Sequence, residues 1–296
     1  MNTMTTHPLS DPTVRQARTV EAVVDGVPTS DGAGVKLSRV LTHHWQRRLD
    51  PYLMLDAFHT DDADDYIGGF PAHPHRGFET VTYMLAGRMR HRDSTGGEGL
   101  LGQGGVQWMT AGAGIVHSEM PEQQEGLMQG FQLWLNLPAK DKLVPAGYRD
   151  IAPDEIPAFA TAGGAQVKLV AGHSHGVDGA MQRPVTEPYY ADVRLAAGGR
   201  FAEAIPAGHN AFVYVYEGAV TIAGQAVTAG RMAVLANDAD ADGVVVEAGG
   251  GARFLLITGA PLKEPIAQYG PFVMNTREQI EQALVDFQRG RMGELA

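Results

Sequence analysis

Residues 70–87 read FPAHPHRGFETVTYMLAG, and the interpretation of the whole chain starts from this stretch. In an extended segment, side chains at positions i and i+2 share a face, so His73 and His75 point the same way and can chelate one ion. Pro74 between them has no backbone N–H for a sheet ladder, which predicts an edge strand or a bulged strand. Glu79 has the same parity if the strand stays regular.

Residues 107–119, QWMTAGAGIVHSE, offer a second pair, because His117 and Glu119 also share a face of an extended segment. The glycines before them allow a sharp turn that brings this segment back against the first. Three imidazoles and one carboxylate suit a divalent transition metal and leave coordination positions open. An isolated His-x-His is usually a surface or hydrogen-bonded pair, but the combination with His-x-Glu is more specific.

The surrounding chain consists of short apolar runs separated by turns. It contains 37 Gly and 17 Pro, a pattern that favours a β-barrel or sandwich over a helical fold. There is a weak internal repeat: TYMLAG at 82–87 resembles VYVYEG at 213–218, 131 residues later. Two similar barrels in tandem are the natural interpretation, joined near residues 138–165, where prolines cluster.

The two ends of the chain differ from this pattern. Residues 1–18 are polar and without a clear period, which predicts a mobile arm. Near the C-terminus, Thr276 can cap a helix, and Gln279 three residues later completes a capping box. The helix would carry one apolar stripe and pack on a barrel; the stripe consists of Ile280, Leu284 and Phe287.

Composition excludes several classes of function. Lys plus Arg number 23 and Asp plus Glu 34, a net charge of −11 that opposes non-specific binding to nucleic acid. Without cysteine there are no disulfides, thiolate zinc sites or cysteine-bound iron–sulfur clusters. No stretch approaches the ~20 apolar residues of a membrane helix, and no signal peptide is visible, so we expect a cytoplasmic protein. The acidic loop at 61–65 lacks the spacing of a calcium loop and is interpreted as a solvated turn.

Four segments together resemble the signature of the pirin family within the cupin superfamily: residues 70–87 and 107–119, HRDSTG at 91–96 and GPFVMN at 270–275. The resemblance runs from about residue 20 to 290. It implies an all-β bicupin, two tandem antiparallel β-barrels with a short C-terminal helix. The boundaries expected on this basis are an arm at 1–18, a metal-binding barrel at 19–140, a linker and metal-free barrel at 141–274, and a helix and tail at 275–296.

The resemblance also implies a ligand set for one divalent transition metal per chain, with Fe²⁺ the expected ion: His73, His75, His117 and Glu119. Glu79 matches a ligand position of many other cupins, but in pirins the carboxylate comes from the second motif. We therefore expect Glu79 to lie behind the ligands and to orient a histidine. The ligand types alone would accept several divalent ions.

The second barrel is expected to be metal-free. A shift of 131 residues places Ala204 and Pro206 where His73 and His75 stand, and neither can bind metal. A further His-x-His at 173–175 has no His-x-Glu partner and is flanked by glycine, so we expect a loop. His209 is solitary and is interpreted as structural or solvent-exposed.

Two functions are compatible with the resemblance. The first is a quercetin 2,3-dioxygenase-type oxidoreductase that opens flavonols or related phenolic substrates with O₂, with Glu119 as catalytic base. The second is an iron-dependent regulatory protein that binds a transcription factor or a metabolic enzyme. The acidic charge suits protein contacts better than direct contact with nucleic acid. Oxygen uptake with flavonols, compared with capture of a partner from lysate, distinguishes the two.

Overall fold

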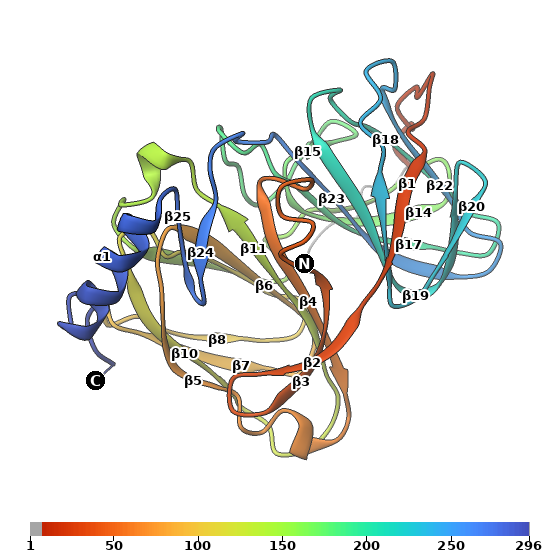
Figure 1. The fold of residues 1–296 in the computed structure, drawn as a ribbon. Coiled ribbons are helices and arrows are strands. Elements are labelled where there is room, and N and C mark those ends of the chain that lie inside the picture. Colours follow the sequence, from red (N-terminus) through yellow and green to blue (C-terminus); the bar gives the residue numbers. More distant parts are fainter. Residues whose placement is uncertain (1–7, 296) are drawn as a thin grey trace. The chain divides into compact units, whose positions relative to one another are not determined.

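The computed structural model describes residues 8–295, in which the chain forms two compact units. We call them the N-barrel and the C-barrel. The N-barrel comprises Val27–Arg47, Pro51–Pro153 and Leu262–Ala296. The C-barrel comprises Met1–Gly26, Arg48–Asp50 and Asp154–Pro261 (Figure 1). Apart from one α-helix and two short 3₁₀ turns, the regular elements of the described residues are β-strands.

The N-barrel is built from two antiparallel sheets. Seven strands form the larger sheet in the order β12-β9-β6-β11-β4-β3-β2. Their bounds are β2 Val27–Asp31, β3 Val35–Leu41, β4 Tyr52–Thr60, β6 Phe78–Ala86, β9 Val106–Thr110, β11 Met128–Asn136 and β12 Gly147–Ile151. The smaller sheet has the order β5-β10-β7-β8, with β5 Phe70–His75, β7 Met89–Asp93, β8 Glu98–Leu101 and β10 Ile115–Pro121. The 3₁₀ turns are η1, Ala63–Asp65, and η2, Ala139–Asp141.

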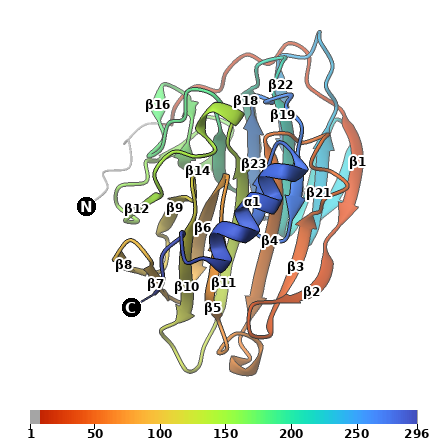
Figure 2. The same cartoon turned by 60° about the vertical axis from the view of Figure 1, so that its left-hand side comes forward.

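The C-terminal residues of the chain belong to the N-barrel. There β24, Ala267–Tyr269, and β25, Phe272–Met274, form a hairpin (Figure 1). The hairpin contacts helix α1, Arg277–Gln288, which is seen in front in Figure 2. The predicted capping box is confirmed, because Gln279 N donates to Thr276 Oγ1 and the Gln279 side chain accepts from Thr276 N. Ile280 is buried as expected, whereas Phe287 is 39% exposed. Among the described residues, no helix has the length and apolar character needed to cross a membrane.

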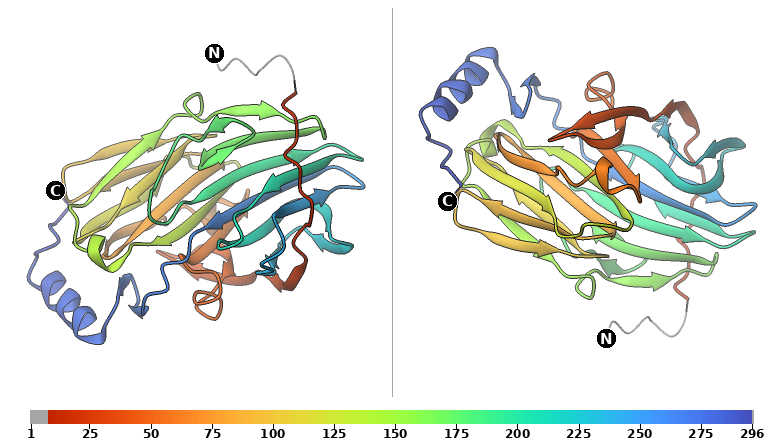
Figure 3. Two further views of the ribbon diagram at one scale, coloured as in Figure 1. Left: turned by 90° about the horizontal axis from the view of Figure 1, so that it is seen from above. Right: turned by 90° about the horizontal axis from the view of Figure 1, so that it is seen from below.

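The C-barrel repeats this plan. Its main path runs β1-β21-β19-β23-β17-β14-β13, and β18, β22 and β20 branch from it. Figure 3 shows the strands of this unit from above and from below, most of them coloured green to blue. The bounds are β1 Val20–Asp25, β13 Ala158–Ala160, β14 Ala165–Ala171, β17 Tyr189–Leu195, β18 Arg200–Ala204, β19 Asn210–Ile222, β20 Gln225–Thr228, β21 Arg231–Leu235, β22 Gly243–Glu247 and β23 Ala252–Gly259. A separate two-stranded ribbon consists of β15, His173–Ser174, and β16, Val177–Asp178.

The internal repeat extends to the order of the strands. The path β9-β6-β11-β4 of the N-barrel corresponds to β21-β19-β23-β17, and β5-β10-β7-β8 corresponds to β18-β22-β19-β20. The long strand β19 corresponds to both β6 and β7. Its first part pairs with β21 and β23, and its second part pairs with β20 and β22. Two barrels of one topology are therefore present, as the repeat predicted.

Residues near the N-terminus belong to the C-barrel, which the sequence did not predict. Strand β1, expected in the first barrel, pairs along its length with β21 of the C-barrel. Residues 8–18, expected in a mobile arm, make backbone hydrogen bonds with the same unit: Leu9 N donates to Ala160 O at 2.8 Å, and Arg18 N to Gly243 O at 2.8 Å. Residues 1–7 of that arm lie outside the described residues.

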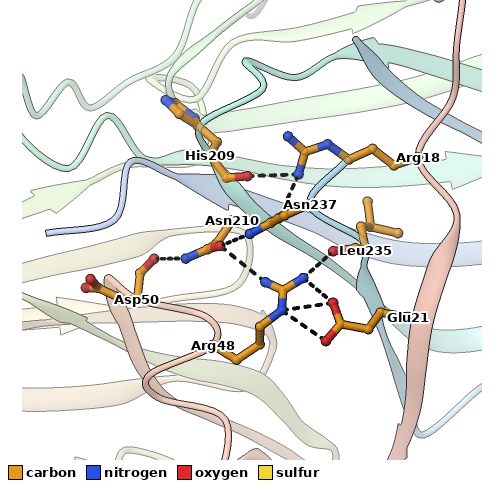
Figure 4. A network of polar contacts seen from close by, with 8 residues as sticks. All are labelled: Arg18, Glu21, Arg48, Asp50, His209, Asn210, Leu235 and Asn237. Carbon is orange, nitrogen blue, oxygen red and sulfur yellow. Dashed lines mark hydrogen bonds and ion pairs between the residues drawn. The ribbon is translucent and has the colours of Figure 1, made fainter. Parts of the chain in front are cut away.

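A polar network joins residues 18–21 and 48–50 to strands of the C-barrel (Figure 4). The Arg18 side chain is fully buried and donates to the carbonyl oxygens of Pro206 and His209 at 2.9 and 2.8 Å. Arg48 forms an ion pair with Glu21 and donates to Leu235 O at 2.8 Å. The short segment 48–50 is thereby tied to the C-barrel although its flanking residues belong to the N-barrel.

Candidate metal centre

Strands β5 and β10 bring the two sequence motifs together. They pair antiparallel with His117 opposite His73 and Ile115 opposite His75, and the register shifts between His117 and Glu119. The chain can leave β5 sharply because Gly77 has φ +88°, in the left-handed region that disfavours other residues. A Cβ on Gly77 would also lie 2.0 Å from Val273 O, so only glycine fits there.

Three of the four expected ligands converge. The Nε2 atoms of His75 and His117 lie 3.0 and 2.9 Å from His73 Nε2. The ligand atoms of these three histidines all lie within 4.8 Å of one another. In the described part of the chain, this is the one group of side chains found that could hold a metal ion. Glu119 is not a member of that group.

Two of the three nitrogen separations have the length expected for ligands at right angles around one ion. Imidazole nitrogens bind divalent metals at about 2.1 Å, so two of them at right angles around one ion are about 3.0 Å apart. The observed separations of 2.9 and 3.0 Å match that value. Three histidines on one face would leave the remaining positions for a carboxylate and for exogenous ligands.

Burial keeps two of the expected ligands unprotonated. His75 and His117 are 3% and 1% exposed. Burial, reinforced by the neighbouring histidines, lowers the pKa of each well below 6.5. A neutral imidazole has the lone pair that metal binding requires, so the site is prepared for a cation at neutral pH.

Two of the three rings, those of His73 and His117, also have a contact on the side away from the cluster. His73 Nδ1 donates to Pro71 O at 2.8 Å, which leaves its Nε2 free to face the other two histidines. The carbonyl of Pro271 faces His75. His117 Nδ1 lies 3.4 Å from His91 Nδ1. Such outer partners orient metal ligands in known metalloproteins.

Glu119, two residues after His117 on β10, is buried and is held by other groups. Its Oε1 accepts a 3.1 Å hydrogen bond from Thr82 Oγ1, and its Oε2 accepts one of 3.0 Å from Gln132 Nε2. The carboxylate therefore has a fixed orientation, and its assignment as the fourth ligand stays a prediction. Glu79 is 2% exposed, and its Oε1 accepts a 2.6 Å hydrogen bond from Thr110 Oγ1.

A cavity of about 590 Å³ opens onto two of the histidines. His73 and His75 line it together with aromatic and polar side chains of the same unit, among them Phe70, Gln132 and Trp134. The Trp134 ring lies 5.4 Å from that of His75 in an edge-on arrangement. The cavity falls in the size range of small-molecule sites and combines apolar walls with a few polar groups.

Sequence reasoning missed several residues around this centre. His91 and Asp93, within the quoted HRDSTG segment, had no assigned role, yet they lie directly behind His117. Arg76, next to His75, forms a buried ion pair of 2.8 Å with Asp286 of helix α1. The signal for His91 was its position in a motif next to the ligand motifs, whereas nothing local could connect residue 76 to residue 286.

The C-barrel holds no comparable group among its described residues. Strand β22, which corresponds to β10, carries buried Val244 and Val246 in an apolar core. His173 and His175 lie on the β15–β16 ribbon and its turn rather than in an irregular loop; His173 is exposed beside Asp178, and the His175 side chain is buried. His209 Nε2 lies 3.3 Å from Glu187 Oε2.

Comparison with known proteins agrees with this architecture. The family model described as Pirin matches residues 34–135, and the model of the Pirin C-terminal cupin domain matches residues 190–293. A Pseudomonas aeruginosa protein named "Putative quercetin 2,3-dioxygenase" is 56% identical over 90% of this chain and 94% of its own. A pirin-like protein of Caulobacter vibrioides is 52% identical over 93% of this chain and 99% of its own.

A solved structure is similar over nearly the whole chain. The crystal structure of quercetin 2,3-dioxygenase from Acinetobacter baumannii superimposes with a TM-score of 0.87 at 33% identity, covering 95% of this chain and 100% of that one. The two matching family models, the relatives and the paired cupin barrels lead to one assignment. The chain belongs to the pirin family.

Proposed function

We propose that this protein is a metal-dependent dioxygenase that opens a flavonol of the quercetin type, or a related phenol, with O₂. His73, His75, His117 and Glu119 would hold one divalent ion, Fe²⁺ in our proposal. The observation that carries the proposal is the convergence of three imidazole nitrogens beside a cavity of substrate size. The names of the P. aeruginosa and A. baumannii relatives supply the substrate class.

The cavity suits a flat, partly polar aromatic molecule. Phe70, Met54 and Trp134 offer apolar and aromatic surface, while Gln132 and Gln268 offer amide groups for phenolic oxygens. Trp134 also contacts Phe78, with ring centroids 4.4 Å apart, which fixes its plane. A rigid wall of this kind would orient the substrate before reaction.

The chain would supply a proton acceptor. A bound divalent metal would lower the pKa of the substrate hydroxyl and hold substrate and O₂ close together. The hydroxyl proton would pass to the Glu119 carboxylate, whose two oxygens are held in place by Thr82 and Gln132. Gln132 lines the cavity and contacts Glu119, so it would connect the substrate pocket to the base.

The test is oxygen uptake and flavonol absorbance followed together in metal-loaded protein purified without a histidine tag. We expect wild type to consume one O₂ per quercetin, and Glu119→Gln and His117→Ala to lose at least about 100-fold in rate, the scale of a removed general base. His173→Ala, at an exposed histidine of the C-barrel, is the matched control and should keep the wild-type rate. Equal rates in all four proteins would show adventitious oxidation, and an inactive, fully metallated wild type would contradict the proposal.

A further inference from the structure

Two side chains of strand β7 form a buried chain of contacts behind His117. His91 and Asp93 are 2% and 4% exposed. His91 Nδ1 lies 3.4 Å from His117 Nδ1, and His91 Nε2 lies 3.1 Å from Asp93 Oδ2. The neighbouring strands β7 and β10 set this arrangement, with Asp93 opposite His117 and His91 opposite Glu119.

Asp93 can only accept hydrogen bonds here. Its Oδ1 already receives three donors: the Thr95 amide at 2.7 Å, the Thr95 hydroxyl at 2.5 Å and the Gly97 amide at 3.2 Å. Oδ2 is directed at His91. The loop after β7 is therefore folded around a carboxylate that acts as a fixed acceptor, and the group facing it must be a donor.

The Asp93 acceptor determines which ring nitrogen carries the proton in His91 and then in His117. His91 has to donate from Nε2 to Asp93, so in the neutral ring its Nδ1 is an acceptor. In the described part of the chain, His91 Nδ1 lies within hydrogen-bond reach of His117 Nδ1, which must then carry the proton. That leaves the lone pair of His117 on Nε2, the atom that lies 2.9 Å from His73 Nε2.

We propose that His91 and Asp93 are positioning residues that hold His117 in its Nδ1–H tautomer with Nε2 directed at the metal. The proposal rests on the proposed function only in that His117 is a ligand. His73 has a backbone carbonyl in the corresponding place, and His75 Nδ1 has no hydrogen-bond partner among the described residues. Of the three histidines, as the structure describes them, His117 is the one whose Nδ1 faces a side chain, so its orientation can be altered by substitution. The Tyr148 ring packs against His91, with ring centroids 4.9 Å apart, and limits the movement of the His91 ring.

The first test reads the tautomers directly. In Zn²⁺-loaded wild type with ¹⁵N-labelled histidine, long-range ¹H–¹⁵N spectra report which ring nitrogen bears the proton. We expect His91 as the Nε2–H form and His117 as the Nδ1–H form with Nε2 bound to zinc. A proton on His91 Nδ1, or a His117 bound through Nδ1, overturns the proposal. This measurement requires no variant to fold.

The second test uses two substitutions that differ in one acceptor. His91→Asn keeps an oxygen near the place of Nδ1, whereas His91→Phe keeps an aromatic ring but no acceptor. By Zn²⁺ competition with a chelator, we expect about 10- to 100-fold weaker binding for His91→Phe, as for other outer partners of metal ligands, and recovery to within about threefold for His91→Asn. His173→Phe serves as the matched control at an exposed histidine.

The outcomes separate this proposal from the metal site itself. If His91→Phe binds Zn²⁺ as tightly as wild type while His73→Ala does not, the metal site stands and the positioning role is overturned. If His73→Ala binds as tightly as wild type, the metal site fails, and the role of His91 fails with it. Thermal unfolding of both His91 variants verifies that the weaker binding does not come from a collapsed N-barrel.

Discussion

At the scale of single residues, the histidines and the carboxylates of the site are held in different ways. The three histidines lie with their Nε2 atoms together, and burial keeps His75 and His117 neutral. Glu119 and Glu79 are each fixed by hydroxyl or amide donors. The i, i+2 spacing was sufficient to predict the histidine pair. It could not reveal His91 behind His117, because that contact depends on which strand lies beside β10.

The ligand roles can be tested by exchanging single groups. His75→Ala should abolish tight binding of Fe²⁺ or Zn²⁺, because it removes one of only three converging nitrogens. Glu79→Gln should bind metal nearly as wild type does, since its carboxylate is engaged by Thr110. Calorimetric titration with Zn²⁺ measures both. The carboxylate assignment is reversed if Glu79→Gln loses the metal and Glu119→Gln keeps it.

Gly77 is the residue whose backbone allows β5 to end beside the site. Gly77→Ala would force a left-handed φ on alanine and place its Cβ against Val273 O, so we expect a loss of about 2 kcal/mol or more in the free energy of unfolding. Urea unfolding measures this loss. Gly96→Ala, also at positive φ but with open space around the added Cβ, is the control for the strain alone. An equal loss in both variants would argue against the close approach at Gly77.

At the scale of elements, helix α1 is tied to the strand that carries His75. The capping box fixed its start, and local sequence was sufficient to predict it. Its docking was not predictable, because Arg76 and Asp286 are 210 residues apart in sequence. The Arg76 guanidinium donates to Asp286 at 2.8 Å and to Ala113 O at 2.6 Å, so it joins the helix, the end of β5 and the loop before β10.

Removal of the charge on Asp286 should loosen this junction. With side chains 8% and 13% exposed, Arg76 and Asp286 form a largely buried pair, and Asp286→Asn leaves the guanidinium without its counter-ion. We expect a loss of about 2–3 kcal/mol in the free energy of unfolding at pH 7. Glu281→Gln, in an exposed pair on the same helix, is the matched control and should cost less than about 0.5 kcal/mol. Similar costs for the two variants would contradict the anchoring role.

The same pair predicts a pH dependence. The Arg76 guanidinium, opposed by burial, lowers the pKa of Asp286 below its ordinary value of 3.8. As the pH falls, Asp286 therefore takes up its proton at a higher pH in the unfolded chain than in the folded one. The stabilisation is complete above about pH 4 and is lost as the pH falls through the lower pKa of the folded state. The stability difference between wild type and Asp286→Asn should shrink below pH 4. A difference that stays constant down to pH 2.5 would exclude the ionised form as its source.

At the scale of the whole molecule, two barrels of one topology differ in what fills their interiors. The repeat at 82–87 and 213–218 predicted the duplication, and the strand orders confirm it. The segments contributed from the two ends of the chain were not predictable. Strand β1 pairs in the C-barrel and residues 262–296 belong to the N-barrel, and a local pattern predicts a strand but not its partner.

Because the metal-capable group is found in one barrel and not in the other among the described residues, we expect one metal ion per chain, bound in the N-barrel. Strand β22, which takes the place of β10 in the strand order, carries buried valines, which cannot bind an ion. The most direct measurement is elemental analysis of untagged wild type, His117→Ala and the control His173→Ala after equilibration with Fe²⁺ under anaerobic conditions and removal of loose metal. We expect one ion per chain in wild type and in His173→Ala, and none retained in His117→Ala. Two tightly bound ions per wild-type chain, or an undiminished content in His117→Ala, would contradict this expectation.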